Sequence, residues 1–437
     1  MIGRLFSALP SRKRRRLRRF RTFSRSKRRV IISGVGIVSP IGIGKELFWK
    51  SLVEGKTGID RISLFDASSF PSQIAGEVRD FEPRAFLNEK QISYYSRATQ
   101  FAFAAARLAK ADAGITCFDP VRTDVVIGAG ASSFEFVDEQ VFRNPYAGRA
   151  YVAGTFDPHG IAKYSINLPA CAIAFAEQIR GYTVTLSTAC ASGLTAIGTA
   201  MERITAGLSD VAIAGAADCA VNHFTLNLFS AANFLNTQND CPDTALCPFD
   251  RRHTKSVLAE GAGIFVFEEL EHALDRGAPI YAELSEFSQQ YENQNEFFGM
   301  DKSGKRWSET ILAVTKNGKI LPEYVNAHGT SDRQMDIIET SALMHAFGER
   351  AAQIPVSSIK GNIGSPFGAA GALQLATAAL AIHKKELPPN YNYRMPDPEC
   401  NLRLDSFRPR TKIKNALVNS HGFGGVNASL FVRELLA

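Results

Sequence analysis

A cysteine stands where the chain passes from an expected strand into an expected helix. Residues 182–186 are mostly β-branched or aromatic and predict the strand, and residues 193–203 are small or apolar and predict the helix. Cys190 lies between them, where the unpaired N–H groups and the positive dipole end of a helix stabilise a thiolate. A thiolate is a nucleophile, so the segment predicts an enzyme that forms a covalent intermediate. The alternative, a small buried structural cysteine, is not excluded by this segment alone.

Three further segments place reactive side chains at the ends of expected strands. His328 stands in a glycine turn after an apolar strand, and Lys360 precedes a glycine-rich helix start. His421 and Phe423 lie in a third glycine-rich turn. A lone histidine usually has a structural partner. One that shares a strand-end position with a candidate nucleophile becomes a candidate for the same site.

The hydrophobic pattern predicts the elements that position these side chains. Apolar segments predict strands at residues 29–34, 124–130, 182–186, 210–217, 263–268, 279–285, 324–328 and 416–420. Helical spacing predicts helices at residues 45–53, 93–111, 193–203, 336–347 and 368–383. Continuous apolar strands that alternate with helices indicate an α/β architecture whose sheet is covered on both faces.

The chain is expected to divide into two halves. The pattern of apolar strands restarts after Gly277, so we predict an N-terminal half at residues 29–276 and a C-terminal half at residues 277–437. The first strand is expected to be short and to run into a glycine turn that ends at Gly42. Residues 286–320 are polar and irregular, which predicts an exposed connection.

Composition is that of an ordinary globular protein. The 437 residues are 45% hydrophobic and 21% charged, and no run reaches the roughly 18 to 20 apolar residues that cross a bilayer. The seven cysteines are an odd number without the close spacing of a disulfide framework. A reducing compartment, the cytoplasm, is therefore the expected location.

The net charge of +7 comes from one end of the chain. Residues 1–29 contain 13 Lys or Arg and no acidic residue, which leaves 37 basic against 43 acidic residues in the remainder. No nucleic-acid binding is therefore expected of the body. Residues 1–28 predict a disordered basic extension, which could contact an anionic surface or act as an organelle-targeting segment.

Neither a bound cofactor nor a metal is expected. The Gly-x-Gly runs lack the longer spacing and the distal acidic residue of a dinucleotide site. Cys241, Cys247 and His253 are the candidate zinc ligands, but their gaps do not match the tight pairs of zinc modules.

Taken together, the segments around Cys190, His328, Lys360 and Phe423 resemble the β-ketoacyl-[acyl carrier protein] synthases of the elongating type, in the thiolase-like superfamily. Residues 28–42, 247–250 and 259–263 resemble further segments of that family, and the motifs follow in the family's order from Arg28 to the C-terminus. The resemblance implies two similar halves in five layers, α-β-α-β-α, and usually a dimer. It also implies acyl chemistry on thioesters of acyl carrier protein, whose phosphopantetheine arm arrives with the substrate.

The resemblance also implies roles for individual residues. Cys190 would accept the acyl chain, and its backbone N–H would form an oxyanion hole with that of Phe423, whose ring would gate the acyl pocket. His328 would stabilise the enolate formed when a malonyl unit loses carbon dioxide. Supporting and substrate-binding positions would be Lys360, Glu339, Asp336, His421, Thr330 and Asp332.

The chain departs from the family pattern inside this site. Ser365 occupies the position of a second catalytic histidine. A hydroxyl can donate one hydrogen bond but carries no positive charge near neutral pH, and losing a strong donor commonly costs about 2.7–4 kcal/mol of transition-state stabilisation. Asp332 replaces a pantetheine-contacting threonine, His253 an arginine and His421 an aromatic residue.

Three functions follow as hypotheses. The first is a β-ketoacyl synthase-type enzyme of fatty-acid or polyketide-type biosynthesis, with decarboxylative condensation and an atypical Cys-His-Ser site. The second is an acyltransferase that uses Cys190 and His328 without decarboxylation. The third is a non-condensing, chain-length-factor-like subunit of another ketosynthase, against which the retained Cys190 argues. The expected partners are acyl carrier protein and either a second copy or a related ketosynthase.

Overall fold

The computed structural model describes residues 28–131, 157–293, 300–404 and 413–436. Two sets of five strands dominate it, joined as β11-β10-β12-β13-β9-β1-β8-β7-β5-β6. The first set contains β1 (Val30–Ser39), β5 (Thr123–Gly128), β6 (Thr183–Leu186), β7 (Val211–Cys219) and β8 (Glu260–Glu269). The second contains β9 (Ala282–Tyr291), β10 (Val325–Asn326), β11 (Val356–Ser357), β12 (Asn415–Gly422) and β13 (Val426–Arg433).

The two sets repeat one topology. In each, the third strand along the chain lies at one edge, followed in space by the second, fourth, fifth and first. The second, third and fourth strands are parallel, and the fifth and first are antiparallel to their neighbours. The sets meet where β1 pairs with β9, with Val30 opposite Leu284. The two sets are separated along the chain between β8 and β9, and the division at residue 276 stays a prediction.

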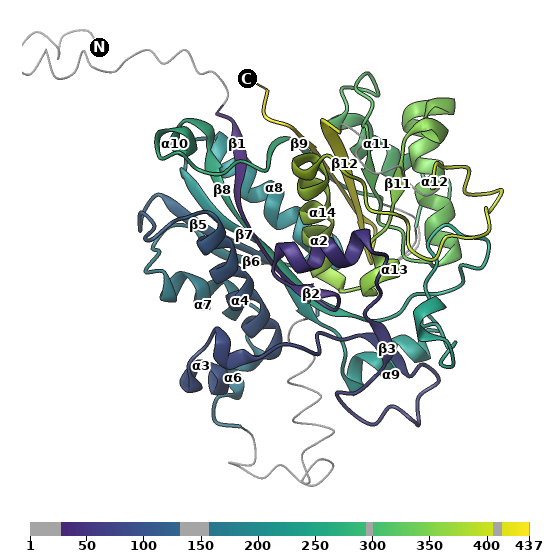
Figure 1. Ribbon diagram of the computed structural model, residues 1–437, viewed down its shortest axis with the longest axis horizontal. Helices are drawn as coiled ribbons and strands as arrows, with labels where there is room; N and C mark the ends of the chain where they lie inside the picture. Colours follow the sequence, from purple (N-terminus) through teal and green to yellow (C-terminus); the bar gives the residue numbers. More distant parts are fainter. Residues whose placement is uncertain (1–27, 132–156, 294–299, 405–412, 437) are drawn as a thin grey trace, which may run out of the picture.

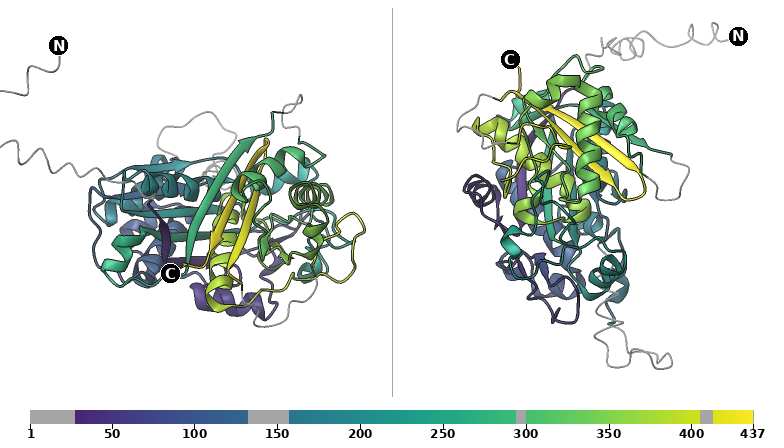
Figure 2. Two further views of the ribbon diagram at one scale, coloured as in Figure 1. Left: turned by 90° about the horizontal axis from the view of Figure 1, so that it is seen from above. Right: turned by 90° about the vertical axis from the view of Figure 1, so that its right-hand side faces the viewer.

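Helices complete five layers (Figures 1 and 2). Helices α8 (Ser192–Thr205) and α14 (Ala370–Lys384) contact each other and strands of both sets, so they form the middle layer. The outer face of the first set is covered by α4 (Arg97–Asp112) and α7 (Leu168–Ala176), and that of the second by α11 (Lys305–Val314) and α12 (Arg333–Phe347). The predicted α-β-α-β-α arrangement is confirmed. The middle position explains why α14 is apolar all round: it is buried from Ala370 to Ile382.

Shorter elements surround these layers. They are β2 (Gly42–Ile43), α2 (Lys45–Val53), β3 (Ile59–Arg61), β4 (Ile74–Gly76), α3 (Glu89–Tyr94), α6 (Gly160–Tyr164), α9 (His223–Ala231), α10 (Leu270–Asp275) and α13 (Lys360–Ile363), with 3₁₀ turns at Pro83–Ala85, Pro242–Thr244, Gly348–Gln353 and Phe367–Ala369. The helix expected at residues 93–111 begins later, because the Ser96 side chain accepts a hydrogen bond from the Thr99 N–H and caps α4.

The expected glycine turn after a short first strand is wrong. β1 runs for 10 residues, and Gly34 and Gly36 lie inside it. A Cβ atom on Gly36 would lie 1.9 Å from the carbonyl oxygen of Ala105, so the glycine allows α4 to pack directly on the strand. Glycine here serves close packing between a helix and a strand rather than a turn.

The exposed connection expected at residues 286–320 is also wrong. β9 continues to Tyr291 because its polar residues pair along β13, and α11 begins at Lys305. Trp307, Ile311 and Val314 are buried at helical spacing on one face of α11. Ser308, Glu309 and Thr310, which stand between Trp307 and Ile311, masked this pattern in the sequence.

The described part of the chain begins next to the expected basic extension. Arg28, where the described part begins, forms an ion pair with Asp210. Residues 1–27 of the basic extension, which the sequence predicts to end at residue 28, lie outside the described residues, so its predicted role stays a prediction. Among the described helices, none combines the length and the apolar character needed to span a membrane.

Candidate active site

One cavity of about 270 Å³ collects most of the predicted site residues. Its wall includes Cys190 from the first half and, from the second, His328, Thr330, Asp332, Ser365, His421 and Phe423. Lys360, Glu339 and Asp336 do not line it and lie buried behind it. The remaining wall is largely apolar and consists of Phe229, Phe234, Leu235, Leu258, Met300, Met335 and Phe367, together with Ser256, Gln334 and Gly424.

Cys190 occupies the predicted strand-to-helix junction, between β6 and α8. The preceding Ala189 has a φ of 51°, a conformation that is uncommon for a residue with a side chain and that makes the turn sharp. Ser192 fixes the turn by accepting a hydrogen bond from the Thr188 N–H at 2.9 Å and donating one to the Ala189 carbonyl at 2.6 Å. The Ser420 hydroxyl donates to the Cys190 carbonyl at 2.9 Å, which joins the turn to β12 of the other half.

The surroundings of Cys190 favour the thiol over the expected resting thiolate. Burial raises the pKa of Cys190 to about 11, although the positive charge of Lys360 and hydrogen bonds from the backbone N–H groups of Phe423 and Cys190 act in the opposite direction. The helix start therefore does not outweigh the loss of water. A base has to remove the proton when the sulfur reacts.

His328 is a neutral hydrogen-bond donor towards the cavity. Its Nδ1 lies 3.4 Å from the backbone nitrogen of His421 and 3.5 Å from Nζ of Lys360. A nitrogen that faces two donors has to be the acceptor, so the ring proton is on Nε2. Burial lowers the pKa of His328 well below its ordinary value, and Lys360 and His421 lower it further.

Glu339 and Lys360 hold the His328 turn from behind. The Glu339 carboxylate accepts hydrogen bonds from the backbone N–H groups of His328 at 2.9 Å and Gly329 at 2.8 Å, and Lys360 donates to the His328 carbonyl. Burial raises the pKa of Glu339 to about 7 and lowers that of Lys360 to about 8. Both residues lie buried beside the His328 turn, and the supporting role that the resemblance implies for them stays a prediction.

A Glu339→Gln variant is expected to lose stability. The amide can accept from one of the two backbone N–H groups and turns its own NH₂ towards the other, which leaves a buried donor unpaired at a cost of about 1–3 kcal/mol. Urea denaturation measures the loss. Glu349→Gln, at an exposed position, is the matched control and should unfold like the parent protein; equal midpoints for both variants would contradict this role of Glu339.

Asp336 belongs to a buried polar network rather than to the cavity. Its Oδ2 accepts from the Phe249 N–H at 2.7 Å and lies 2.9 Å from Nδ1 of His253. Nε2 of His253 lies 3.1 Å from Asp397, which also accepts from Arg333 at 2.8 Å. His253 stands where an arginine is usual in the family. It thus connects the segment before β8 to the start of α12.

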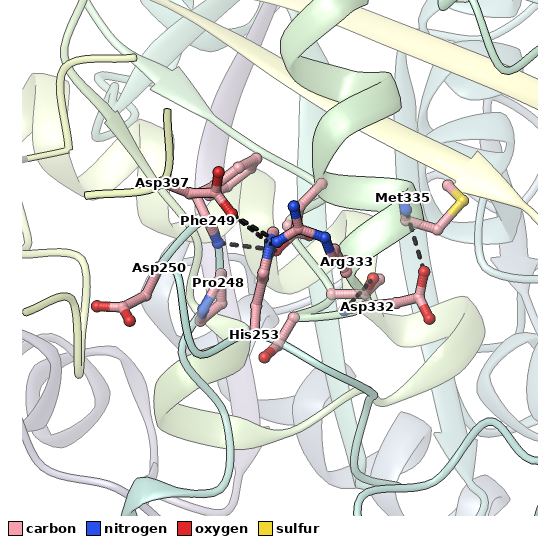
Figure 3. A network of polar contacts seen from close by, with 12 residues as sticks. Pro248, Phe249, Asp250, His253, Asp332, Arg333, Met335 and Asp397 are labelled. Carbon is pink, nitrogen blue, oxygen red and sulfur yellow. Dashed lines mark hydrogen bonds and ion pairs between the residues drawn. The ribbon is translucent and has the colours of Figure 1, made fainter. Parts of the chain in front are cut away.

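Thr330, Asp332 and Ser365 line the cavity with their polar groups partly engaged. Asp332 accepts from the Met335 N–H at 3.0 Å and caps α12, so one of its oxygens has a structural task (Figure 3). The Thr330 hydroxyl accepts from the Asp332 N–H at 3.3 Å. Backbone hydrogen bonds from Ser365 N–H to Val257 and from Ala259 N–H to Ser365 hold the serine at the cavity wall.

Two polar residues of the site are missing from the sequence-based prediction. Asn427 lies opposite His421 in the β12–β13 pair, with its Oδ1 2.8 Å from Nδ1 of His421. Glu292 accepts from the Asn427 amide at 2.8 Å. Glu292 lies in the stretch expected to be an exposed connection, and no motif marks it. Trp307, from the same stretch, packs against His421 with ring centroids 5.3 Å apart.

Comparison with known proteins shows which proteins share this arrangement. Residues 27–273 match the β-ketoacyl synthase N-terminal domain, and residues 281–394 match the β-ketoacyl synthase C-terminal domain. The chain is 37% identical over 413 residues to the ketoacyl synthase alpha subunit of the tetracenomycin polyketide synthase of Streptomyces glaucescens, which covers 92% of this chain and 96% of that protein. It is 36% identical over 415 residues to 3-oxoacyl-[acyl-carrier-protein] synthase 2 of Coxiella burnetii, covering 94% and 99%.

Comparison with solved structures points to the same family. A type II polyketide ketosynthase in complex with its acyl carrier protein matches with a TM-score of 0.86 and 30% identity, over 94% of this chain and 100% of that chain. The ishigamide ketosynthase/chain length factor matches with a TM-score of 0.84 and 28% identity, with the same coverage. The thiolase-like fold is thereby confirmed. On the strength of both domain matches and these relatives, the chain belongs to the β-ketoacyl synthase family.

Proposed function

We propose that this protein transfers an acyl group to Cys190 and condenses it with a carrier-bound malonyl unit, in fatty-acid or polyketide-type biosynthesis. The observation that carries the proposal is the shared cavity. It places a thiol, a neutral imidazole donor and the backbone N–H groups of Cys190 and Phe423 on one largely apolar wall.

The first step is acyl transfer. Sγ of Cys190 attacks the carbonyl carbon of the acyl thioester, and the negative oxygen that forms is stabilised by the backbone N–H groups of Cys190 and Phe423. The C–S bond to the phosphopantetheine arm then breaks, and the carrier leaves as the free thiol. The product is an acyl thioester on Cys190, with the acyl chain among the apolar side chains of the cavity.

The second step is condensation. The malonyl thioester loses carbon dioxide and becomes an enolate, whose oxygen accepts a hydrogen bond from Nε2–H of His328. The enolate carbon attacks the acyl carbonyl, and the bond to Sγ breaks. This frees Cys190 and leaves a chain two carbons longer on the carrier. Ser365 contributes at most one neutral hydrogen bond.

Phe423 is suited to control entry to the cavity. Its side chain is 52% exposed and packs edge-to-face on Phe234, with ring centroids 5.8 Å apart. An aromatic contact of this kind is worth about 0.5–1.5 kcal/mol, and the exposed part of the ring faces solvent at the cavity wall. This supports the gating role that the family resemblance implies.

Acyl carrier protein and a second subunit are the proposed partners. The matching solved structures are a ketosynthase with its acyl carrier protein and a ketosynthase/chain length factor. In this chain β6 is the edge of the sheet and is half-exposed, and Phe175 on the neighbouring α7 is 84% exposed. An open strand edge beside an exposed aromatic side chain fits a second subunit at this edge.

One experiment tests the proposal. The protein is incubated with an acyl-carrier thioester and malonyl-carrier, while intact mass follows acyl-Cys190 and a second assay follows carbon dioxide. Acylation with a ketoacyl product supports condensation. Acylation without carbon dioxide favours the acyltransferase alternative, which Ser365 makes the second candidate. A lack of acylation combined with tight binding to a related ketosynthase would replace both with a chain-length-factor-like subunit.

Ser365→His is expected to raise the rate of condensation about tenfold or more, because an imidazole donates a stronger hydrogen bond to the enolate than a hydroxyl does. Carbon dioxide release from malonyl-carrier measures the change. Acylation of Cys190, which does not depend on the enolate, serves as the internal control and should keep its rate. A condensation rate that stays at the level of the parent protein would show that Ser365 is not what limits this step.

A further inference from the structure

His421 is held by a chain of hydrogen bonds that crosses three strands. It stands at the end of β12 and is 4% exposed, Asn427 is its partner on β13, and Glu292 follows β9, the next strand. Nδ1 of His421 lies 2.8 Å from Oδ1 of Asn427, and Nδ2 of Asn427 donates to Glu292 at 2.8 Å. The backbone N–H of Glu292 donates to Gly425 at 2.8 Å, which fixes this end of the chain of contacts.

These contacts determine where the protons are. A carboxylate only accepts, so the Asn427 amide has to turn its NH₂ group towards Glu292. The amide oxygen then faces His421 and accepts from Nδ1–H. Burial lowers the pKa of His421, so the neutral ring carries its single proton on Nδ1 and a lone pair on Nε2. Among the described residues Nε2 has no hydrogen-bond partner, although it is buried and its ring lines the cavity.

The two imidazoles of the cavity therefore have opposite tautomers. His328 offers Nε2–H, a donor, and His421 offers a lone pair, an acceptor. The other polar residues on the wall are weaker candidates. Ser256, Thr330, Gln334 and Ser365 carry hydroxyl or amide groups, which are poor bases, and Asp332 caps α12. His421 also lies close to the nucleophile, because Phe423, two residues along, hydrogen-bonds to the Cys190 sulfur through its backbone N–H.

We propose that His421 is the proton acceptor for Cys190, with Asn427 and Glu292 as positioning residues. The inference rests on the proposed acyl transfer. As Sγ attacks the acyl carbonyl, its proton moves to Nε2 of His421, which becomes an imidazolium whose Nδ1–H still bonds to Asn427. When the C–S bond to the carrier breaks, the imidazolium returns the proton to the leaving thiolate. The step consumes no proton, and the ring ends in the tautomer in which it began.

Alkylation of Cys190 by iodoacetamide, followed by peptide mass mapping between pH 5 and 10, tests the acceptor independently of any acyl substrate. With His421 as base, the parent protein should show a rate plateau around neutral pH, because above its own pKa the neutral imidazole takes the thiol proton while the sulfur attacks the reagent, at a rate that does not depend on pH. His421→Asn retains an amide N–H near the Nδ1 position and lacks Nε2, and His421→Phe lacks both. Both variants should lose the plateau, with at least a tenfold lower rate at pH 7. His345→Asn, exposed on α12, is the matched control and should keep it.

The positioning residues give a second readout. Glu292→Gln removes a negative charge 3.6 Å from Nδ1 of His421, which lowers the stability of the imidazolium. The acid side of the plateau should therefore move to lower pH, a shift that a purely structural role would not produce. Unchanged pH profiles in His421→Asn and His421→Phe would overturn the inference. If the plateau depends on His421 but the protein accepts no acyl group from acyl-carrier, the inference holds and the proposed function is rejected. If acylation proceeds at the parent rate in the His421 variants, the proposed function holds and the inference is rejected.

Discussion

Cys190→Ala is expected to abolish covalent acylation, with no acyl adduct detectable by intact mass after incubation with an acyl-carrier thioester. Nothing else in the described cavity can replace the sulfur, because the hydroxyls on its wall, those of Ser256, Thr330 and Ser365, are far weaker nucleophiles at neutral pH. Condensation should fall with it, because the acyl thioester is its substrate. The loss should exceed a thousandfold and reach the detection limit.

The control for this prediction is another free cysteine. Cys171 lies exposed on α7, away from the cavity, and Cys171→Ala should acylate like the parent protein. The turn after β6 is held by Ser192 and Ser420 and not by the sulfur of Cys190, so the loss of that atom should leave the fold intact. Circular dichroism checks this. An acyl adduct of unchanged yield in Cys190→Ala would mean that the nucleophile lies elsewhere.

His328→Ala is expected to slow condensation about a hundred- to a thousandfold, which corresponds to about 2.7–4 kcal/mol for the loss of one donor to a developing oxyanion. Carbon dioxide release from malonyl-carrier measures the effect. Acylation should fall less, because its oxyanion is stabilised by backbone N–H groups that the substitution leaves in place.

The protonation state of His328 provides a further check. Burial, Lys360 and His421 keep the pKa of His328 below its ordinary value, so the ring is neutral throughout the neutral range. The factor lost in His328→Ala should therefore be constant from about pH 7 to 9. His345→Ala, on the outer helix α12, should leave the condensation rate unchanged. A factor that grows steeply as the pH falls through 7 would show that a charged imidazolium, and not a neutral donor, does the work.

Much of the architecture could be predicted because it depends on local pattern. The apolar strands β5, β7 and β8 are buried on both faces, so they appear in the sequence as uninterrupted runs. α11 could not be predicted in this way, because polar residues stand between its buried Trp307 and Ile311 and its role depends on β9 and β13. The length of β1 could not be predicted for a related reason. Its glycines are typical of a turn in the sequence, and only the packing of α4 explains why they lie inside a strand.

The properties of the site also fall into two groups, those that local motifs predict and those that depend on contacts between distant segments. The glycine turns with Cys190, His328 and Lys360 are motifs that the sequence displays, and the structure brings them to one place. The charge state of the thiol could not be predicted, because it depends on how far the surrounding elements exclude water. The tautomer of His421 follows from Asn427 and Glu292, which are 6 and 129 positions away along the chain but adjacent across the sheet.

The nucleophile of the cavity comes from the first set of strands, and both imidazoles come from the second. The two sets are joined through the β1–β9 pair and the helices between them. Neither portion of the polypeptide, produced separately, would contain a complete reaction centre. Fragments divided in the turn that precedes β9 should be inert on their own, and activity should return only on mixing, through complementation. Turnover would then report assembly of the native core directly, without a spectroscopic label.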